Sequence, residues 1–234
     1  MPAITSIEIF LAHVRTCTDT PAAPTLERRI TAWLAYYHSL QFIRERYHQT
    51  NTAYVQAMTH YLQMRERLPR DPRLSPTAAQ HAWEEAHALH RTLQEKQTSF
   101  YTFAAGLLDS IADTFQCYFA LAWPRSDITH ARLTRDFHAL CLEHRLLPAP
   151  AALPTLMREL HAYIVAAPAS RAPVIDERPE ERLMSLTTAI DVYIAAMMQF
   201  FTRNVEHSVL GRGRADHRQA MGASHPPAHP SPLA

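Results

Sequence analysis

Apolar and aromatic residues between Leu26 and Leu68 recur in alternating steps of four and three positions. This spacing lines up side chains along one face of a helix, so the segment is predicted to form a long amphipathic helix. Three polar residues interrupt the seam. The complete series is Leu26, Ile30, Trp33, Tyr37, Leu40, Arg44, Tyr47, Asn51, Tyr54, Met58, Tyr61, Arg65 and Leu68.

A second long helix is predicted from Ser75 to Trp123. The segment LPRDPRLSP (68–76) contains three prolines and cannot be helical throughout, whereas Ser75 followed by Pro76 is a favourable helix start. Two long helices joined by a short loop predict an antiparallel hairpin of 26–68 against 75–123. The second seam reads Ala79, Trp83, Ala86, His90, Leu93, Gln97, Phe100, Ala104, Leu107, Ile111 and Tyr118.

Shorter helical patterns flank this hairpin. Thr25 is the predicted cap of the first long helix. Because the chain contains only four glycines, which β-rich folds need for tight turns, we expect an all-α helical bundle with a single domain over 1–210. Residues 211–234 lack an apolar period and are predicted to be a disordered tail. The shorter helices are expected at 4–16, from a Ser126 cap to Leu147, from Pro154 to Val165, and from Pro179 to near Leu210–Gly211.

Net charge changes this picture little. The formal charge of +1 provides no basic field that would drive binding to a nucleic acid or a membrane by itself. The chain has no run of about 18 apolar residues and no basic leader, so no membrane span and no signal peptide are predicted. Cys17, Cys117 and Cys141 are odd in number and widely spaced, which indicates reduced thiols in the cytoplasm.

Two acids interrupt the most apolar stretch, Phe100–Trp123. Asp109 and Asp113 are four residues apart and share one helix face. Asp109 is a candidate to order an arginine or histidine of a catalytic site, or to take part in a metal pair. The alternative is that both acids lie at the edge of the buried face and are paired with arginine, because a carboxylate there needs a partner or water.

Arg203 and His207 form the strongest candidate for chemistry. On a continuous helix they would be neighbours on one face. An imidazole can move a proton to or from a ribose 2′-hydroxyl or the leaving oxygen, and a guanidinium can stabilise charge on the phosphate. This combination is what metal-independent RNA cleavage requires. The alternative is a solvated or helix-capping pair.

These residues also carry a resemblance to a known family. The stretch FYTFAAGLLDSIA (100–112) and the late helix IDVYIAAMMQFFTRNVEH (190–207) are similar to segments of bacterial proteins of the HEPN superfamily. Members of that superfamily carry an arginine and a histidine on a late helix, often with a polar residue after the arginine. The resemblance implies a helical bundle, often a homodimer, that binds RNA or a nucleotide. It also implies an endoribonuclease site at Arg203, Asn204 and His207.

Two other functions remain open. The first is a non-catalytic helical scaffold or dimerisation module that uses the hairpin seam as its partner surface. The second is a metal-binding helical bundle, since Glu84-x-x-His87 matches half of a di-iron ligand set; such a site also needs a second Glu-x-x-His and two further glutamates on facing helices. The sequence also lacks GxGxxG, Walker A, GxSxG and HExxH motifs, so no cofactor is expected.

Overall fold

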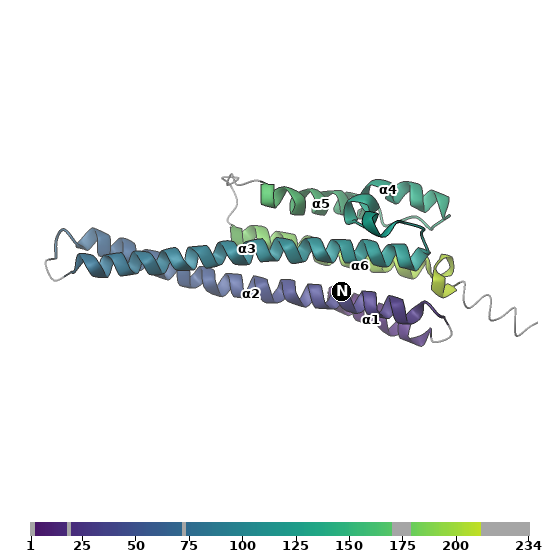
Figure 1. The fold of residues 1–234 in the computed structure, drawn as a ribbon, viewed down its shortest axis with the longest axis horizontal. Coiled ribbons are helices and arrows are strands. Elements are labelled where there is room, and N and C mark those ends of the chain that lie inside the picture. Colours follow the sequence, from purple (N-terminus) through teal and green to yellow (C-terminus); the bar gives the residue numbers. More distant parts are fainter. Residues whose placement is uncertain (1–2, 18–19, 72–73, 170–178, 212–234) are drawn as a thin grey trace, which may run out of the picture. The chain divides into compact units, whose positions relative to one another are not determined.

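The computed structural model describes residues 3–17, 20–71, 74–169 and 179–211. These residues form α-helices and two 3₁₀ turns, with no strand among them, which confirms the predicted all-α class (Figure 1). The elements are α1 (Ala3–Thr16), α2 (Ala23–Arg67), α3 (Pro76–Phe119), η1 (Arg125–Asp127), α4 (His130–Glu143), α5 (Leu153–Ala169), α6 (Pro179–Arg203) and η2 (Val205–His207).

The start of α3 agrees with its prediction, and the start of α2 does not. The Ser75 hydroxyl accepts a hydrogen bond from the backbone N of Thr77 at 3.2 Å, just before Pro76 opens α3. In contrast, α2 begins at Ala23, so Thr25 lies inside the helix and does not cap it. Proline is compatible with a first helical turn, whose N–H groups have no helical partner. Residues 23–25 therefore belong to the first turn of α2.

Two compact units make up the fold. Unit 1 contains 1–34, 109–158 and 191–234, and unit 2 contains 35–108 and 159–190. The boundaries predicted at 1–210 and 211–234 remain a prediction, and residues 212–234 lie outside the described part of the chain.

Unit 1 has an aromatic core around Phe201. The Phe201 ring lies with its centroid 4.7 Å from Tyr118 and 6.1 Å from Trp33, and it also contacts Phe10, Phe115 and Phe119. The indole Nε1 of Trp33 donates to the Thr114 hydroxyl at 2.9 Å, and the Tyr118 hydroxyl donates to the Phe201 carbonyl at 3.0 Å. The apolar density of 109–119 therefore serves packing in this unit.

Unit 2 contains an antiparallel pair formed by α2 and α3. Ring contacts join Tyr36 to Phe103, Tyr54 to His90 and Tyr61 to Trp83, so residue numbers rise along α2 as they fall along α3. A Cβ atom built on Gly106 would lie 2.7 Å from Tyr36 Cε1, so this close approach favours glycine. These contacts are those predicted for a hairpin. The hairpin over its whole length extends through both units and remains a prediction.

The C-terminal end of α3 provides a stability prediction. The helix ends at Phe119, not at Trp123, and Ala120 has a φ of 55° in the left-handed region. The backbone N of Leu121 donates to the Gln116 carbonyl at 2.9 Å, as in the helix ends that favour glycine. We expect Ala120→Gly to raise the free energy of unfolding by about 0.5–1 kcal/mol, because it removes the left-handed penalty of alanine.

Chemical denaturation of the full chain measures this change. Ala139→Gly is the matched control, because Ala139 is exposed inside α4 and glycine there should lower stability by about 1 kcal/mol. A loss of stability in both variants would contradict the assignment of Ala120 to a glycine-favouring helix end.

Candidate functional site

The predicted pair Arg203 and His207 lies at the C-terminal end of α6. The helix stops at Arg203, and His207 belongs to the separate turn η2. The prediction that one helix continues to Leu210–Gly211, with both side chains on one face, is therefore wrong. The catalytic role of Arg203 and His207 stays a prediction.

The side chain of Asn204 explains why α6 ends there. Its Nδ2 donates to the Phe200 carbonyl at 3.0 Å, a local bond that competes with continuation of the helix. Its Oδ1 accepts from the backbone N of Leu147 at 2.6 Å. Asn204 is 0% exposed. The predicted site residue thus ties the α4–α5 loop to the end of α6.

This tie brings cationic side chains from two elements to the same region. Arg203 is exposed and His207 is half-buried. Arg145, also exposed, lies two residues before Leu147 in the loop that Asn204 holds. Guanidinium and imidazolium groups of this kind can bind phosphate oxygens through charge-assisted hydrogen bonds.

Asp109 contacts the beginning of α4. Its Oδ1 accepts from the backbone N of His130, the first residue of that helix, at 2.8 Å. Thr129 caps the same turn, so the predicted Ser126 cap is wrong, and 125–127 form the turn η1 instead. A carboxylate at this position interacts favourably with the positive end of the helix dipole. Asp109 is 21 residues from its partner, so local sequence gave no signal of the contact.

Asp113 is paired with an arginine, as the alternative interpretation expected. The Arg29 guanidinium forms an ion pair with the Asp113 carboxylate. The same guanidinium donates to the Asp113 carbonyl at 3.1 Å. Both side chains are about one-third exposed, so we assign this pair a role in joining α2 to α3 within unit 1.

A buried polar pair in unit 1 has no counterpart among the predicted site residues. His130 is 1% exposed, and its Nε2 lies 3.0 Å from the Tyr193 hydroxyl. The Thr134 hydroxyl lies 3.4 Å from the other ring nitrogen, and burial raises the pKa of Tyr193. Sequence spacing gives no indication of this pair, because His130 and Tyr193 are 63 residues apart.

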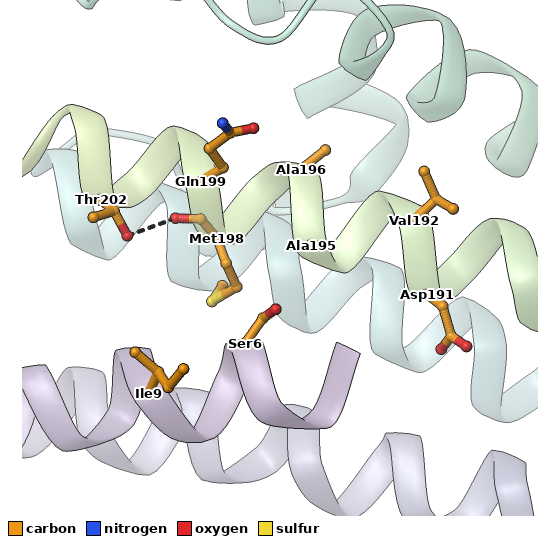
Figure 2. A pocket seen from close by; sticks show the side chains of 9 residues that line it. All are labelled: Ser6, Ile9, Asp191, Val192, Ala195, Ala196, Met198, Gln199 and Thr202. Carbon is orange, nitrogen blue, oxygen red and sulfur yellow. Dashed lines mark hydrogen bonds between the residues drawn. The ribbon is translucent and has the colours of Figure 1, made fainter. Parts of the chain in front are cut away.

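An open groove of about 700 Å³ lies between α1 and α6 in unit 1. In Figure 2 the Met198 side chain points from α6 towards Ser6 of α1. Asp191 is the one acidic residue of the lining, and the other lining residues are apolar or uncharged polar. The lining residues are Ser6, Ile9, Asp191, Val192, Ala195, Ala196, Met198, Gln199 and Thr202.

Unit 2 carries an exposed aromatic surface on its α2–α3 pair. No side chain of α2 from His48 to Arg67 is buried, although apolar residues recur through this stretch. Trp83 is 39% exposed and stacks on His87 with ring centroids 5.5 Å apart. We call this surface the arm face and define it by Tyr54, Val55, Met58, Tyr61, Leu62, Trp83, His87 and His90.

The first turn of α6 contacts α2 immediately before the arm face. Glu180 accepts a hydrogen bond from Asn51 Nδ2 at 2.6 Å. Glu180 also forms a hydrogen-bonded ion pair with His48, and the hydrogen bond between Glu180 and His48 raises the pKa of His48. Burial and the charge of Glu180 raise the pKa of Tyr47 to about 12. At 100° per residue, His48 and Asn51 share a side of α2 with Val55 and Leu62, so α6 packs on the side where the arm face continues.

Metal and thiol chemistry find little support in the described residues. No three His, Cys, Asp or Glu side chains in the described ranges lie together as a metal ligand set would. None of the three cysteines forms a disulfide. Burial raises the pKa of the Cys117 thiol, and it raises that of Cys141 to about 11, so both stay protonated near neutral pH.

Of the described helices, α6 is long and apolar enough to span a membrane by length and composition. Half of the most apolar 18-residue stretch of α6 is buried within the protein, as in a core helix. Comparison with known protein families, characterised proteins and solved structures finds no match for the chain. The HEPN-like resemblance therefore stays a prediction.

Proposed function

We propose that this protein is a non-catalytic, cytoplasmic helical scaffold that forms a homodimer through the arm face. The observation that carries the proposal is the exposure of Val55, Leu62 and Trp83, at 54%, 50% and 39% of their surface. By contrast, the N-terminal part of α2 is buried within the chain, with Leu26, Ile30 and Trp33 at 0% exposure. The proposed partner surface is thus confined to the C-terminal part of α2 and the part of α3 that contacts it.

The width of the arm face supports a bundle of more than two helices. Tyr54, Met58 and Tyr61 follow the spacing that joins two helices, and they contact α3 or lie beside it. Val55 and Leu62 each directly follow one of these seam residues, and they widen the apolar stripe on one side of α2. A helix with such a wider stripe normally faces two neighbours. A second copy of the α2–α3 pair would supply the missing layer as a four-helix bundle.

We expect Leu62→Glu to weaken self-association by about tenfold or more, because the dimer would bury an unpaired carboxylate. Leu62 is half exposed in the single chain, so the variant should fold normally. Sedimentation velocity over a concentration series measures the dissociation constant. Ile9→Glu is the matched control, since Ile9 is 57% exposed on the groove of unit 1 and should leave the constant unchanged. A parent protein that is monomeric at every concentration would refute the proposal.

A second candidate is the RNA- or nucleotide-binding function implied by the HEPN-like resemblance. The observation that favours it is the Asn204–Leu147 hydrogen bond, which holds the loop that carries Arg145 at the end of α6, where Arg203 lies. In this alternative the guanidinium groups hold phosphate and His207 transfers a proton.

Fluorescence anisotropy with a single-stranded RNA oligonucleotide tests this candidate. We expect Arg203→Ala to weaken binding about tenfold, because it removes a charge-assisted hydrogen bond. Arg158→Ala is the control, since Arg158 is an exposed arginine of α5. If the protein cleaves RNA in the presence of a metal chelator, His207→Ala should slow cleavage at least about 100-fold. Equal binding by both arginine variants would exclude a role for Arg203.

A further inference from the structure

A polar pocket of about 430 Å³ lies in unit 1, in addition to the groove between α1 and α6. Its walls come from α2, from the C-terminal part of α3 and from the segment around η1. The lining residues are Arg29, Asp113, Gln116, Arg125 and Ile128. The volume lies within the range of about 300–1,000 Å³ that is usual for small-molecule sites.

The Arg29 guanidinium is held by Asp113 and still has donors left for a ligand. Its Nη1 makes the contacts with both the carboxylate and the backbone carbonyl of Asp113. Its Nε and Nη2 make no hydrogen bond with any other described residue. Because the contacts with Asp113 orient the guanidinium, its remaining N–H groups are preorganised for binding.

Arg125 contributes a second guanidinium from a different element. Gln116 ties the chain after α3 back to that helix, because its Nε2 donates to the Leu121 carbonyl at 3.0 Å and to the Trp123 carbonyl at 3.2 Å. Arg125 follows two residues later and is exposed. Within the described residues its side chain forms no hydrogen bond or ion pair.

The acid closest to Arg125 in the sequence is already paired elsewhere. Asp127 accepts hydrogen bonds from Arg132 Nη1 at 2.8 Å and from the Ser126 hydroxyl at 3.0 Å. The pocket lining itself contains two guanidinium groups and one carboxylate, that of Asp113. The lining therefore has one positive charge without a counter-charge, which favours an anionic ligand.

We propose that this pocket binds a phosphate monoester of a small molecule, with Arg29 and Arg125 donating hydrogen bonds to the phosphate oxygens. A phosphate monoester has three terminal oxygens and can accept from two guanidinium groups, whereas one guanidinium fork already engages both oxygens of a carboxylate. Ile128 provides an apolar contact for the organic part of the ester. The pocket shares no residue with the arm face, so this proposal does not depend on the homodimer.

An NMR titration of the full chain with inorganic phosphate tests the site at constant ionic strength. We expect saturable shifts of the Arg29 and Arg125 Nε–H signals. Arg125→Ala should raise the dissociation constant about tenfold, because it removes a charge-assisted hydrogen bond. Arg28→Ala is the matched control, since Arg28 is exposed, directly precedes Arg29 on α2 and does not line the pocket. Its dissociation constant should equal that of the parent.

Asp113→Asn should change the affinity in the opposite direction. The substitution keeps the shape of the side chain and removes a negative charge beside the bound phosphate, so we expect the dissociation constant to fall about 3- to 10-fold. A purely structural role of Asp113 predicts weaker binding instead. Weaker binding by a variant whose circular dichroism melting matches the parent would contradict the proposed position of the phosphate.

The remaining outcomes bear on the ligand class. Phenyl phosphate should bind more tightly than inorganic phosphate, and weaker binding would overturn the role of Ile128. Acetate that binds as tightly as phosphate would overturn the assignment to phosphate. The site itself would be overturned by a parent with no saturable shift, or by equal dissociation constants for Arg125→Ala and Arg28→Ala. A loss of binding in Arg203→Ala but not in Arg125→Ala would place the anion at the end of α6 and would also overturn it.

Discussion

Phe201→Ala is expected to lower the free energy of unfolding of unit 1 by about 3–5 kcal/mol. Phe201 is fully buried and contacts five aromatic rings from α1, α2 and α3. Removing its ring opens a cavity that these large, rigid neighbours can fill only in part. The loss then includes both the transfer energy of the ring and the energy of the cavity.

Urea denaturation of the full chain measures this effect. Leu142→Ala is the control in the same unit, because Leu142 is 68% exposed and its truncation should cost less than about 0.5 kcal/mol. A loss below about 1 kcal/mol for Phe201→Ala would show that the core rearranges around the missing ring, contrary to the close-packed description of unit 1.

The second large effect is expected for Asn204→Ala, at about 1–3 kcal/mol. The substitution leaves the backbone N of Leu147 without its acceptor and removes the bond to the Phe200 carbonyl. Arg203→Ala, one residue away and exposed, should stay within about 0.5 kcal/mol of the parent. Comparison of these two variants therefore distinguishes a structural role of Asn204 from a binding role of Arg203.

Hydrogen exchange gives an independent measurement for Asn204→Ala. The Leu147 amide should lose protection in this variant and keep it in Arg203→Ala, because only the first change removes the acceptor. Unchanged stability and unchanged protection at Leu147 would contradict the role of Asn204 as the tie between the α4–α5 loop and α6.

The sequence predicted the helices better than their ends. The four-and-three spacing identified α2 and α3 because side chains on one helical face must repeat with that period. The same spacing misled the prediction of the end of α6. Val205 and Leu210 continue the apolar rhythm, and Leu210 is buried, yet the chain reaches its position through a turn rather than a helix. Periodicity alone does not distinguish these two routes.

The contacts of the candidate site residues were less accessible to sequence reasoning. Asp109 binds α4 at His130, 21 residues away, and Asn204 binds Leu147, 57 residues away. The partner in each contact can be identified only once the fold is known, because the two residues are far apart in the sequence. The arginine partner of Asp113 was expected as a residue type, because a carboxylate beside a buried face requires a counter-charge, but the sequence could not select Arg29 among the arginines.

The positions of the three cysteines make thiol alkylation a measure of local opening in unit 1. Cys17, Cys117 and Cys141 all belong to unit 1, and 35–108 and 159–190 contain no cysteine. Cys17 is buried and the other two are half-buried with raised pKa values, so alkylation in the native state should be slow. The rate of thiol alkylation therefore reports local opening of unit 1, and unit 2 does not contribute because it contains no cysteine. Phe201→Ala should accelerate this labelling, and Leu62→Glu should not.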